Sequence, residues 1–363
     1  MQRPPADATP VLEVENLVRH FSIGRGLFRR KLTVRAVDGV SFSVAAGETL
    51  ALVGESGCGK TTVGRLALRL LEPSAGAVRV EGDDLARLSG EALRRKRAGM
   101  QLVFQDPYTS LNPRMTVGEA LAEPVRLHGG PESGDPEGRA AELLRLVGLQ
   151  QEHAERYPHQ FSGGQRQRIG IARALASRPR LLVCDEPVSA LDVSIQAQII
   201  NLLMDLQRQF QLSFLFISHD LGVVRHISDR VAVMYLGRIV EVARTAELFG
   251  NARHPYTHAL IASAPVGRST AGPPVEPLAG EPPNPVAPPP GCHFHTRCPH
   301  ATSECSQVAP RLEETGAGAL VACHHWRGLA MPAAVRERLQ PDMSDLPVRR
   351  RQKKFREAVA ARL

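Results

Sequence analysis

The feature that most constrains this chain is a glycine-rich segment between an apolar run and an amphipathic stretch. The apolar run Thr49–Val53 has the length of a buried strand, and apolar residues recur at helical spacing over Thr61–Leu71. Strand, loop and helix in this order are the context in which the pattern G-x-x-x-x-G-K-S/T binds phosphate. The pattern is formed here by Gly54, Glu55, Ser56, Gly57, Cys58, Gly59, Lys60 and Thr61. The sequence therefore predicts a P-loop at the start of an α/β sheet.

The residue types of this loop suit ATP and Mg²⁺. Glycines let backbone N–H groups close around phosphate oxygens, and the N-terminus of the following helix favours negative charge. We expect Lys60 to reach the β- and γ-phosphates and Thr61 to bind Mg²⁺. The whole segment from Gly54 to Thr62 is expected to contact the nucleotide.

A pair of carboxylates ends a second apolar run. Leu181–Cys184 has the pattern of a buried strand, and Asp185 and Glu186 follow it directly. Alone, such a pair is more often a helix cap or a turn than a catalytic site. In a chain with a P-loop, however, the carboxyl ends of parallel strands form the edge that binds ligands. We therefore expect Asp185 to hold Mg²⁺ and Glu186 to polarise the attacking water as a general base.

Alternating and helical patterns outline the rest of the fold. Val11–Asn16 and Ala36–Val44 predict paired strands, and residues 116–178 have a helical pattern. Two further strands are predicted at Phe214–Ile217 and Arg230–Tyr235. A helix is predicted at Ile195–Phe210, between Leu181–Cys184 and the first of these strands. Strands that alternate with helices indicate a parallel sheet. We predict an α/β fold of the P-loop NTPase class.

The composition changes after Gly250. Pro265–Pro290 contains ten prolines, too many for the interior of a helix or strand, so we expect an extended linker. Four cysteines then fall between Cys292 and Cys323, before a basic tail with helical spacing.

The formal net charge of +8 does not by itself indicate a nucleic-acid partner. Arg349–Leu363 holds seven Lys/Arg and one acid, and two other basic runs, Arg25–Lys31 and Arg94–Arg97, are short and separate. Separate runs argue against one continuous groove that follows the phosphate backbone of a nucleic acid. These basic runs are therefore expected to face solvent or to contact anionic lipid. No apolar stretch approaches the roughly 20 residues that span a bilayer, and Met1–Pro10 lacks the apolar region of a signal peptide. We expect a cytoplasmic chain without a nucleic-acid partner.

A short segment in the helical region links the chain to a family. Ser162, Gly163, Gly164 and Gln165 resemble the L-S-G-G-Q signature of ABC ATPases, with Phe161 in place of the leucine. Hydroxyl and glycine amides at a helix start form a second anion cradle. In this family the signature covers the γ-phosphate bound by the opposite subunit. The resemblance implies a dimer with two composite ATP sites, built on a RecA-like core with an antiparallel β subdomain and a helical subdomain.

Further residues match the family in order. Gln105 resembles the Q-loop glutamine, which senses Mg²⁺ and the attacking water and contacts the membrane subunits. Asp192 resembles the D-loop aspartate at the dimer interface, and His219 resembles the switch histidine that bonds the γ-phosphate. Phe21 is expected to stack on adenine, with core packing as the alternative, because residues 22–35 look inserted between it and the P-loop.

Longer segments narrow the resemblance to one branch. The segments around the P-loop, the Q-loop and the signature, and the sequence His254-Pro255-Tyr256-Thr257, resemble ATP-binding subunits of dipeptide, oligopeptide and nickel importers. This implies two membrane permease subunits, a second ATP-binding subunit that is either a sister chain or a copy of this one, and an indirect solute-binding protein. The implied location is the cytoplasmic face of a bacterial inner membrane. Peptide is the expected cargo; nickel, glutathione or another small solute is the alternative, as is a soluble ABC ATPase acting on ribosomes or DNA.

Four cysteines lie outside the ATP-site motifs, which contain Cys58 and Cys184. Cys292, Cys298, Cys305 and Cys323 have the spacing C-x5-C-x6-C-x17-C, without the close pairs of most zinc sites. The hypothesis is a structural 4Fe-4S cluster, which the resemblance favours because some members of this branch carry one. Zinc and unliganded thiols are the alternatives. We expect three parts: an ABC ATP-binding domain over 1–250 with its helical subdomain at about 106–178, a C-terminal extension with the cysteines over 251–330, and a basic tail over 331–363.

Overall fold

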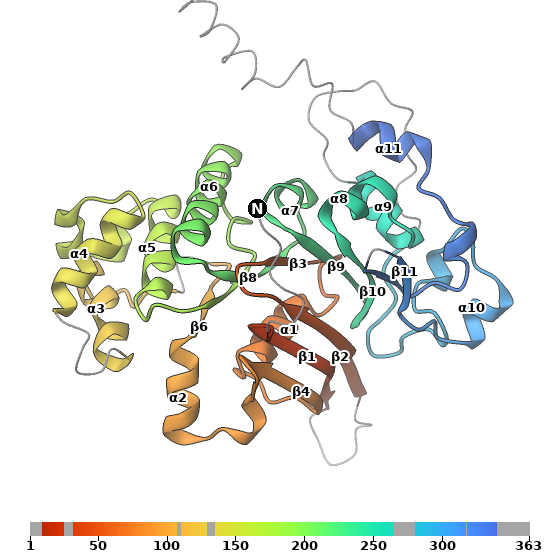
Figure 1. Ribbon diagram of the computed structural model, residues 1–363, viewed down its shortest axis with the longest axis horizontal. Coiled ribbons are helices and arrows are strands. Elements are labelled where there is room, and N and C mark those ends of the chain that lie inside the picture. Colours follow the sequence, from red (N-terminus) through yellow and green to blue (C-terminus); the bar gives the residue numbers. More distant parts are fainter. Residues whose placement is uncertain are drawn as a thin grey trace, which may run out of the picture.

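A mixed sheet of eight strands forms the centre of the molecule (Figure 1). The computed structural model describes residues 9–24, 32–106, 110–128, 135–263, 280–316 and 318–339. The strand order is β11-β12-β10-β9-β3-β8-β7-β6, and the strands from β9 to β6 are parallel. Their bounds are Arg230–Tyr235 (β9), Thr49–Val53 (β3), Ser213–Ser218 (β8), Leu181–Asp185 (β7) and Met100–Val103 (β6).

The other edge of this sheet is antiparallel, which the strand and helix pattern did not predict. Strand β10 turns back on β9 through Leu236 and Gly237, both of which have positive φ, as a two-residue type I′ hairpin requires. Two short strands from the C-terminal extension continue the sheet beyond β10. The bounds are Arg238–Arg244 (β10), Ala319–Val321 (β12) and Glu313–Gly316 (β11).

A second, antiparallel sheet of four strands lies below the central one in Figure 1. Its order is β2-β1-β4-β5, so the predicted pairing of the first two strands is confirmed, although both are longer than their patterns indicated. The bounds are Leu32–Val44 (β2), Leu12–Ile23 (β1), Ala75–Val80 (β4) and Asp83–Asp84 (β5). Predicted features at 25–31 lie outside the described residues.

Helices cover both faces of the central sheet. In Figure 1, α1 (Lys60–Ala67) lies on the side of the second sheet, and α6 (Val193–Phe210) and α7 (Leu221–Ile227) lie on the opposite side. Every residue of β3, β7 and β8 is buried, which explains their almost continuous apolar sequences.

A helical region lies at one end of the molecule. It contains α3 (Val117–His128), α4 (Pro136–Leu146) and α5 (Gly163–Leu175), and α2 (Gly90–Ala98) lies below it in Figure 1. The three helices share one apolar cluster with β7 and α6. Short 3-10 turns complete the region and the segment before it: Leu85–Arg87, Gln151–Glu155 and Pro158–Gln160.

The C-terminal extension lies at the other end of the molecule. Aromatic rings join it to the core: Tyr235 of β9 lies 4.6 Å from Tyr256 and 5.3 Å from Phe294, centroid to centroid. Its elements are α9 (Pro255–Ser263) and α10 (Ser303–Gln307), with 3-10 turns at His295–Arg297 and Trp326–Gly328. Helix α8 (Thr245–Asn251) leads into it, and α11 (Ala333–Leu339) follows it. The predicted linker Pro265–Pro290 is described only from residue 280, and residues 280–290 form no helix or strand. Residues 264–279 and the tail beyond 339 lie outside the described residues. None of the helices in the described part of the chain is long and apolar enough to span a bilayer.

Candidate functional site

The P-loop connects the end of β3 to the start of α1. At two of its positions the surrounding backbone leaves room only for glycine. Gly59 has φ +109°, and a Cβ there would lie 2.0 Å from the carbonyl oxygen of Ala36. A Cβ on Gly54, at φ +157°, would lie 2.2 Å from the carbonyl oxygen of Met234. The loop is therefore pressed between β2 and β9, with its backbone close to both strands.

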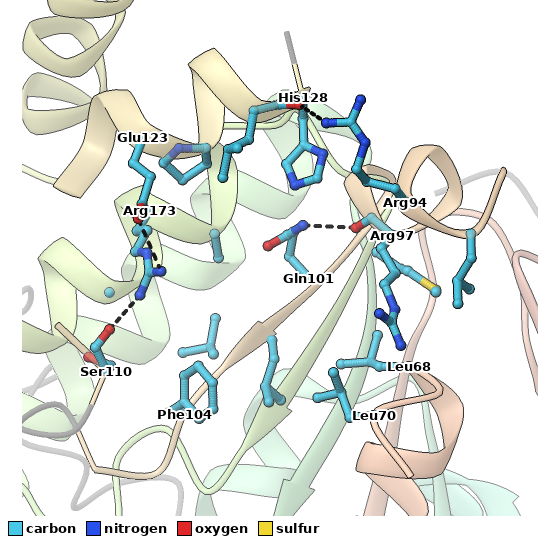
Figure 2. A pocket seen from close by; sticks show the side chains of 18 of the residues that line it. Leu68, Leu70, Arg94, Arg97, Gln101, Phe104, Ser110, Glu123, His128 and Arg173 are labelled. Carbon is cyan, nitrogen blue, oxygen red and sulfur yellow. Dashed lines mark hydrogen bonds and ion pairs between the residues drawn. The ribbon is translucent and has the colours of Figure 1, made fainter. Parts of the chain in front are cut away.

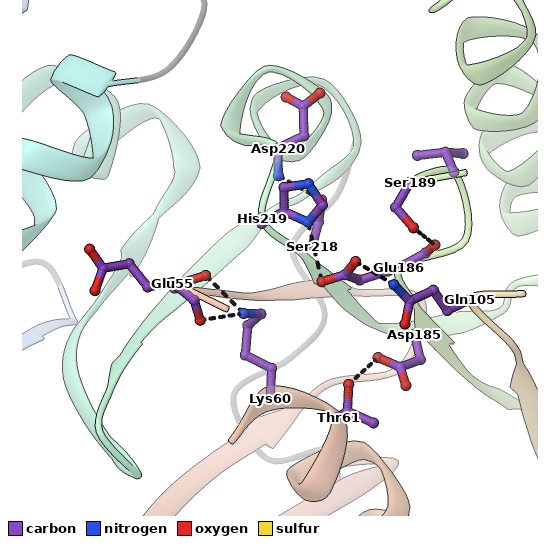
Figure 3. A network of polar contacts seen from close by, with 12 residues as sticks. Glu55, Lys60, Thr61, Gln105, Asp185, Glu186, Ser189, Ser218, His219 and Asp220 are labelled. Atoms are coloured by element: carbon purple, nitrogen blue, oxygen red, sulfur yellow. Dashed lines mark hydrogen bonds and ion pairs between the residues drawn. The ribbon is translucent and has the colours of Figure 1, made fainter. Parts of the chain in front are cut away.

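The lysine and threonine of the loop contact opposite parts of the site (Figure 3). Lys60 is buried, and its Nζ donates to the carbonyl oxygens of Gly54 and Glu55 at 2.8 and 2.9 Å. Thr61 Oγ1 donates to Asp185 Oδ1 at 2.9 Å. Burial raises the pKa of the Asp185 carboxyl; the Thr61 hydrogen bond opposes this rise, and the charge of Glu186 adds to it. A hydroxyl and a carboxylate oxygen side by side are the ligand type that Mg²⁺ prefers.

Glu186 lies between the other two predicted catalytic residues. Gln105 Nε2 donates to Glu186 Oε2 at 3.0 Å, and His219 Nδ1 lies 3.2 Å from Glu186 Oε1, as Figure 3 shows. Glu186 has φ +46°, the left-handed region that non-glycine residues rarely occupy. Such backbone strain is concentrated at functional sites, where the surrounding structure holds it in place. Here the carboxylate is held from both sides.

These residues surround one cavity of about 550 Å³. This volume lies in the usual range for small-molecule sites. Its lining includes nine of the residues singled out from the sequence: Ser56, Gly57, Gly59, Lys60, Thr61, Thr62, Gln105, Glu186 and His219. The structure therefore brings together, in one space, groups that come from four separate parts of the chain.

The cavity is also lined by three residues that sequence reasoning did not find. They are Val34, Ala36 and Pro285, two from β2 and one from the extension. Phe21 lies outside the described lining; it pairs with Val34 across β1 and β2, and the Arg19 guanidinium lies 4.7 Å from its ring centroid. No local pattern marks Val34 or Pro285, because their position depends on how distant segments pack.

The signature residues occupy a different surface. Ser162 caps α5: its Oγ accepts from the Gln165 N–H, and its own N–H donates to Gln165 Oε1. Gly163 and Gly164 form the first turn of that helix, next to Leu191 and Ile195. Among the described residues, this signature set and Asp192, which precedes α6, lie outside the cavity lining. The signature residues, which are expected to form a second anion cradle, are thus separate from the P-loop cavity of the same chain.

A second cavity, of about 700 Å³, lies between α2, β6, α3 and α5 (Figure 2). We call it the groove. Leu70, Phe104 and Leu127 line it with 50, 45 and 55% of their surface exposed, so the groove gathers exposed apolar side chains in one place. Arg173 and Arg94 brace its walls by donating to the carbonyl oxygens of Ser110 and Leu127.

The groove adjoins the ATP-site cavity through two neighbouring residues. Phe104 lines the groove, and Gln105 lines the cavity that contains Glu186. Sequence reasoning identified Gln105 but not the groove, because its lining is scattered over residues 68 to 174.

The four cysteines of the extension are near one another and partly buried. Burial raises the pKa of the Cys323 thiol to about 11 and also raises the pKa of Cys292 and Cys298, and neighbouring thiols add to each rise. In the part of the chain that the structure describes, no group of three or more His, Cys, Asp or Glu side chains is arranged to hold a metal ion. The expected 4Fe-4S cluster, and zinc as its alternative, therefore have no support from this geometry.

Comparisons with known proteins agree with the geometry of the ATP site. Residues 37–189 match the family described as ABC transporter, and residues 240–305 match the family described as oligopeptide/dipeptide transporter, C-terminal region. The oligopeptide transport ATP-binding protein AppF of Bacillus subtilis is 52% identical over 323 residues, which cover 88% of this chain and 98% of AppF. The di/tripeptide transport ATP-binding protein DppF of Pseudomonas aeruginosa is 48% identical over 315 residues, which cover 87% of this chain and 97% of DppF.

Solved structures give the same result. The dimeric ATP-binding cassette MJ0796, bound to ADP and Pi, has a TM-score of 0.57 and 28% identity over 64% of this chain and 98% of its own. The cbiO1 protein of Clostridium perfringens, part of the ABC transporter complex cbiONQ, has a TM-score of 0.57 and 26% identity over 66% of this chain and 90% of its own. The predicted α/β P-loop fold is confirmed. The chain belongs to the ATP-hydrolysing subunits of ABC transporters, in the branch that carries the oligopeptide/dipeptide transporter C-terminal region.

Proposed function

We propose that this chain is the energy-coupling ATPase of an importer for di- and oligopeptides. The observation that carries the proposal is the arrangement of Gln105, Glu186 and His219 around the P-loop cavity, in a chain whose C-terminal part matches the peptide-transporter family. The relatives AppF and DppF, which are 52% and 48% identical to this chain, are described as oligopeptide and di/tripeptide transport ATP-binding proteins. Their descriptions supply the cargo class.

The residues divide the work of hydrolysis among them. The P-loop amides and Lys60 bind the phosphates of ATP, and Glu186 takes a proton from the water that attacks the γ-phosphorus. The bond to the β–γ bridging oxygen breaks, and ADP and phosphate leave. Gln105 and His219 hold the Glu186 carboxylate in position for this transfer. Thr61 and Asp185, with Gln105, would hold Mg²⁺, which when bound neutralises phosphate charge.

We further propose that two ATP-binding subunits close around the nucleotide. The signature residues Ser162–Gln165 and the adjacent Asp192 lie outside the cavity of their own chain, which suits a second chain that brings them to the γ-phosphate. The second subunit is a copy of this chain or a sister ATPase. Closure driven by ATP and reopening after hydrolysis form the two-state element that does mechanical work.

The groove is the surface that we assign to a membrane permease subunit. Its exposed apolar side chains suit an amphipathic helix of a partner, and Phe104 connects it to Gln105 in the ATP site. A partner in the groove would therefore respond to the nucleotide through adjacent residues. This arrangement would hold the chain at the cytoplasmic face of the membrane through the permeases, with a solute-binding protein as an indirect partner.

The test is uptake of labelled di- and tripeptides by cells that carry the native gene or its Glu186→Gln variant, with nickel uptake measured in parallel. We expect the variant to lose peptide uptake and to keep nickel uptake. Loss of nickel uptake alone would make nickel the cargo. If neither uptake changes although the variant still binds ATP, the importer proposal fails, and ribosome and DNA binding would be measured next.

A matched pair of variants tests the groove. Leu127→Glu places a charge in it, and Val308→Glu places one on the extension, where Val308 is 51% exposed. We expect only Leu127→Glu to abolish peptide uptake and copurification with the permeases, with ATPase activity of the isolated subunit unchanged in both. Equal copurification of both variants would contradict this docking surface.

The iron-sulfur hypothesis rests on the family resemblance alone. Iron and acid-labile sulfide assays on anaerobically purified protein test it. Four irons and four sulfides per chain are the expected result if a cluster is present, and the absence of both rejects it.

A further inference from the structure

An arginine of the cysteine-bearing segment reaches into the P-loop. Arg297 ends the 3-10 turn between Cys292 and Cys298, and its Nη1 and Nη2 bind Glu55 Oε2 and Oε1 at 2.8 and 3.1 Å. The arginine is buried and the carboxylate is partly buried: the Arg297 side chain is 6% exposed and the Glu55 side chain 24%. Such a two-point pair fixes direction as well as distance.

The extension also holds the backbone of the same residue. The Glu55 N–H donates to the Tyr256 hydroxyl at 2.9 Å. Tyr256 is fully buried and packs on Tyr235 and Phe294, so the accepting hydroxyl has a fixed position. Both the side chain and the peptide of Glu55 are therefore anchored to elements outside the ATP-binding core.

Glu55 in turn contacts the lysine of the loop. Lys60 Nζ donates to the Glu55 carbonyl oxygen, while Figure 3 shows the Glu55 side chain pointing away from Lys60. Glu55 lies outside the described lining of the cavity, so its carboxylate faces the extension rather than the nucleotide space. Any effect of this carboxylate on ATP would have to pass through the loop.

A third contact brings the extension to the nucleotide space itself. The Pro285 carbonyl oxygen accepts from the Arg35 N–H at 3.3 Å, and Pro285 lines the cavity beside Val34 and Ala36. The extension thus touches both the loop that binds phosphate and the strand opposite it.

We propose that the C-terminal extension is a built-in part of the ATP site, in which Arg297 is a positioning residue that holds the P-loop through Glu55. The proposal rests on the assignment of the P-loop as the ATP site. Removing one partner of a buried pair leaves the other charge uncompensated, so the loop must shift to rehydrate it. Arg297 does not reach the reacting atoms, so its loss should weaken ATP binding and leave the chemical step almost unchanged.

The experiment uses the full-length protein with Arg297→Met and a matched control, Arg327→Met. Arg327 belongs to the same extension and pairs with Glu313, but its side chain is 72% exposed. We expect Arg297→Met to raise both the dissociation constant of ATP and the KM by about tenfold, equivalent to about 1.4 kcal/mol, with kcat changed by less than about twofold. Arg327→Met should behave as the native protein.

Further variants separate positioning from loss of folding and from failure of the site assignment. Glu55→Gln keeps the shape of the loop residue and removes the charge, so we expect it to raise KM as Arg297→Met does, and the double variant to be no worse than Arg297→Met alone. Arg297→Lys should fall between. Lys60→Ala should abolish ATP binding; if it does not, the P-loop assignment fails. If Arg297→Met and Glu55→Gln both bind ATP as Arg327→Met does, the positioning role of Arg297 is overturned.

Discussion

At the scale of single residues, two P-loop glycines share a left-handed backbone but differ in their surroundings. Gly59 and Gly57 both have positive φ, at +109° and +79°. A Cβ on Gly59 would overlap the Ala36 carbonyl oxygen, whereas a Cβ on Gly57 has no atom within 4 Å. The motif requires glycine at position 59 and accepts any residue at position 57. The structure adds that both positions have a left-handed backbone and that only Gly59 also faces a steric overlap.

This difference predicts the relative stability of two variants. Gly57→Ala should cost only the strain of a left-handed alanine, about 1 kcal/mol. Gly59→Ala adds a backbone overlap and should cost at least about twice as much. Thermal unfolding in the absence of nucleotide checks this, and equal midpoints for the two variants would show that β2 moves away from the loop.

Thr61 supports a second prediction at this scale. Its hydroxyl donates to Asp185, and the two oxygens form the proposed Mg²⁺ pair. Thr61→Val keeps the shape and removes the hydroxyl, so the Mg²⁺ concentration for half-maximal ATPase activity should rise at least about tenfold. Thr61→Ser retains the hydroxyl and serves as the control. If Thr61→Val needs the same Mg²⁺ concentration for half-maximal activity as the native protein, Thr61 is not a ligand.

At the scale of elements, β10 places a carboxylate where the strand pattern would not. Val240 is an extra residue in the pairing of β10 with β9, and every residue from Ile239 to Ala243 is buried, so both faces of the strand are covered here. Glu241 lies in this stretch and is 3% exposed. The N–H groups of Arg253 and His254 donate to its two oxygens and so connect β10 to the start of α9.

The buried Glu241 predicts a pH dependence of stability. Burial raises its pKa from 4.5 to about 7, against the opposing effect of its hydrogen bonds. The folded state therefore holds this proton more tightly than the unfolded state, so the contribution of Glu241 to stability is complete below pH 4.5 and is lost as the pH rises through 7. Within this window the change is about 1.4 kcal/mol per pH unit.

Glu241→Gln removes this contribution. The variant should lose stability relative to the native protein as the pH is lowered from about 7.5 to about 5, because it no longer gains the proton. Urea unfolding at several pH values measures the difference, with Glu314→Gln, an exposed carboxyl on β11, as the control. A constant difference between native and variant across this range would contradict the raised pKa.

At the scale of the whole molecule, the contacts that join distant segments mark the limit of what the sequence predicts. The α/β order, the P-loop and the Asp185-Glu186 pair follow from local patterns, because each depends on neighbours along the chain. The ion pair of Arg297 and Glu55 leaves no local pattern, because the two residues are separated by 242 positions. The antiparallel edge leaves none either, because its strand β12 has only three residues. The groove is similarly assembled from residues of four elements.

At the same scale, the P-loop and the signature residues are separated within one chain. The signature at the start of α5 and the P-loop at the start of α1 lie on different surfaces, and next to Asp192 the apolar Val193 is 81% exposed. A second chain that covers the nucleotide would bury this side chain. Glu186→Gln should slow hydrolysis enough to keep the closed state populated.

We therefore expect ATP to double the molecular mass of the Glu186→Gln variant from 39.4 kDa, as measured by light scattering after size exclusion. Adding Val193→Glu should prevent the doubling, because closure would bury a charge, whereas adding Val308→Glu should not. A single-chain mass with ATP would contradict self-pairing and require a sister subunit. Doubling in the presence of Val193→Glu would instead place the dimer contact elsewhere, away from the signature and Asp192.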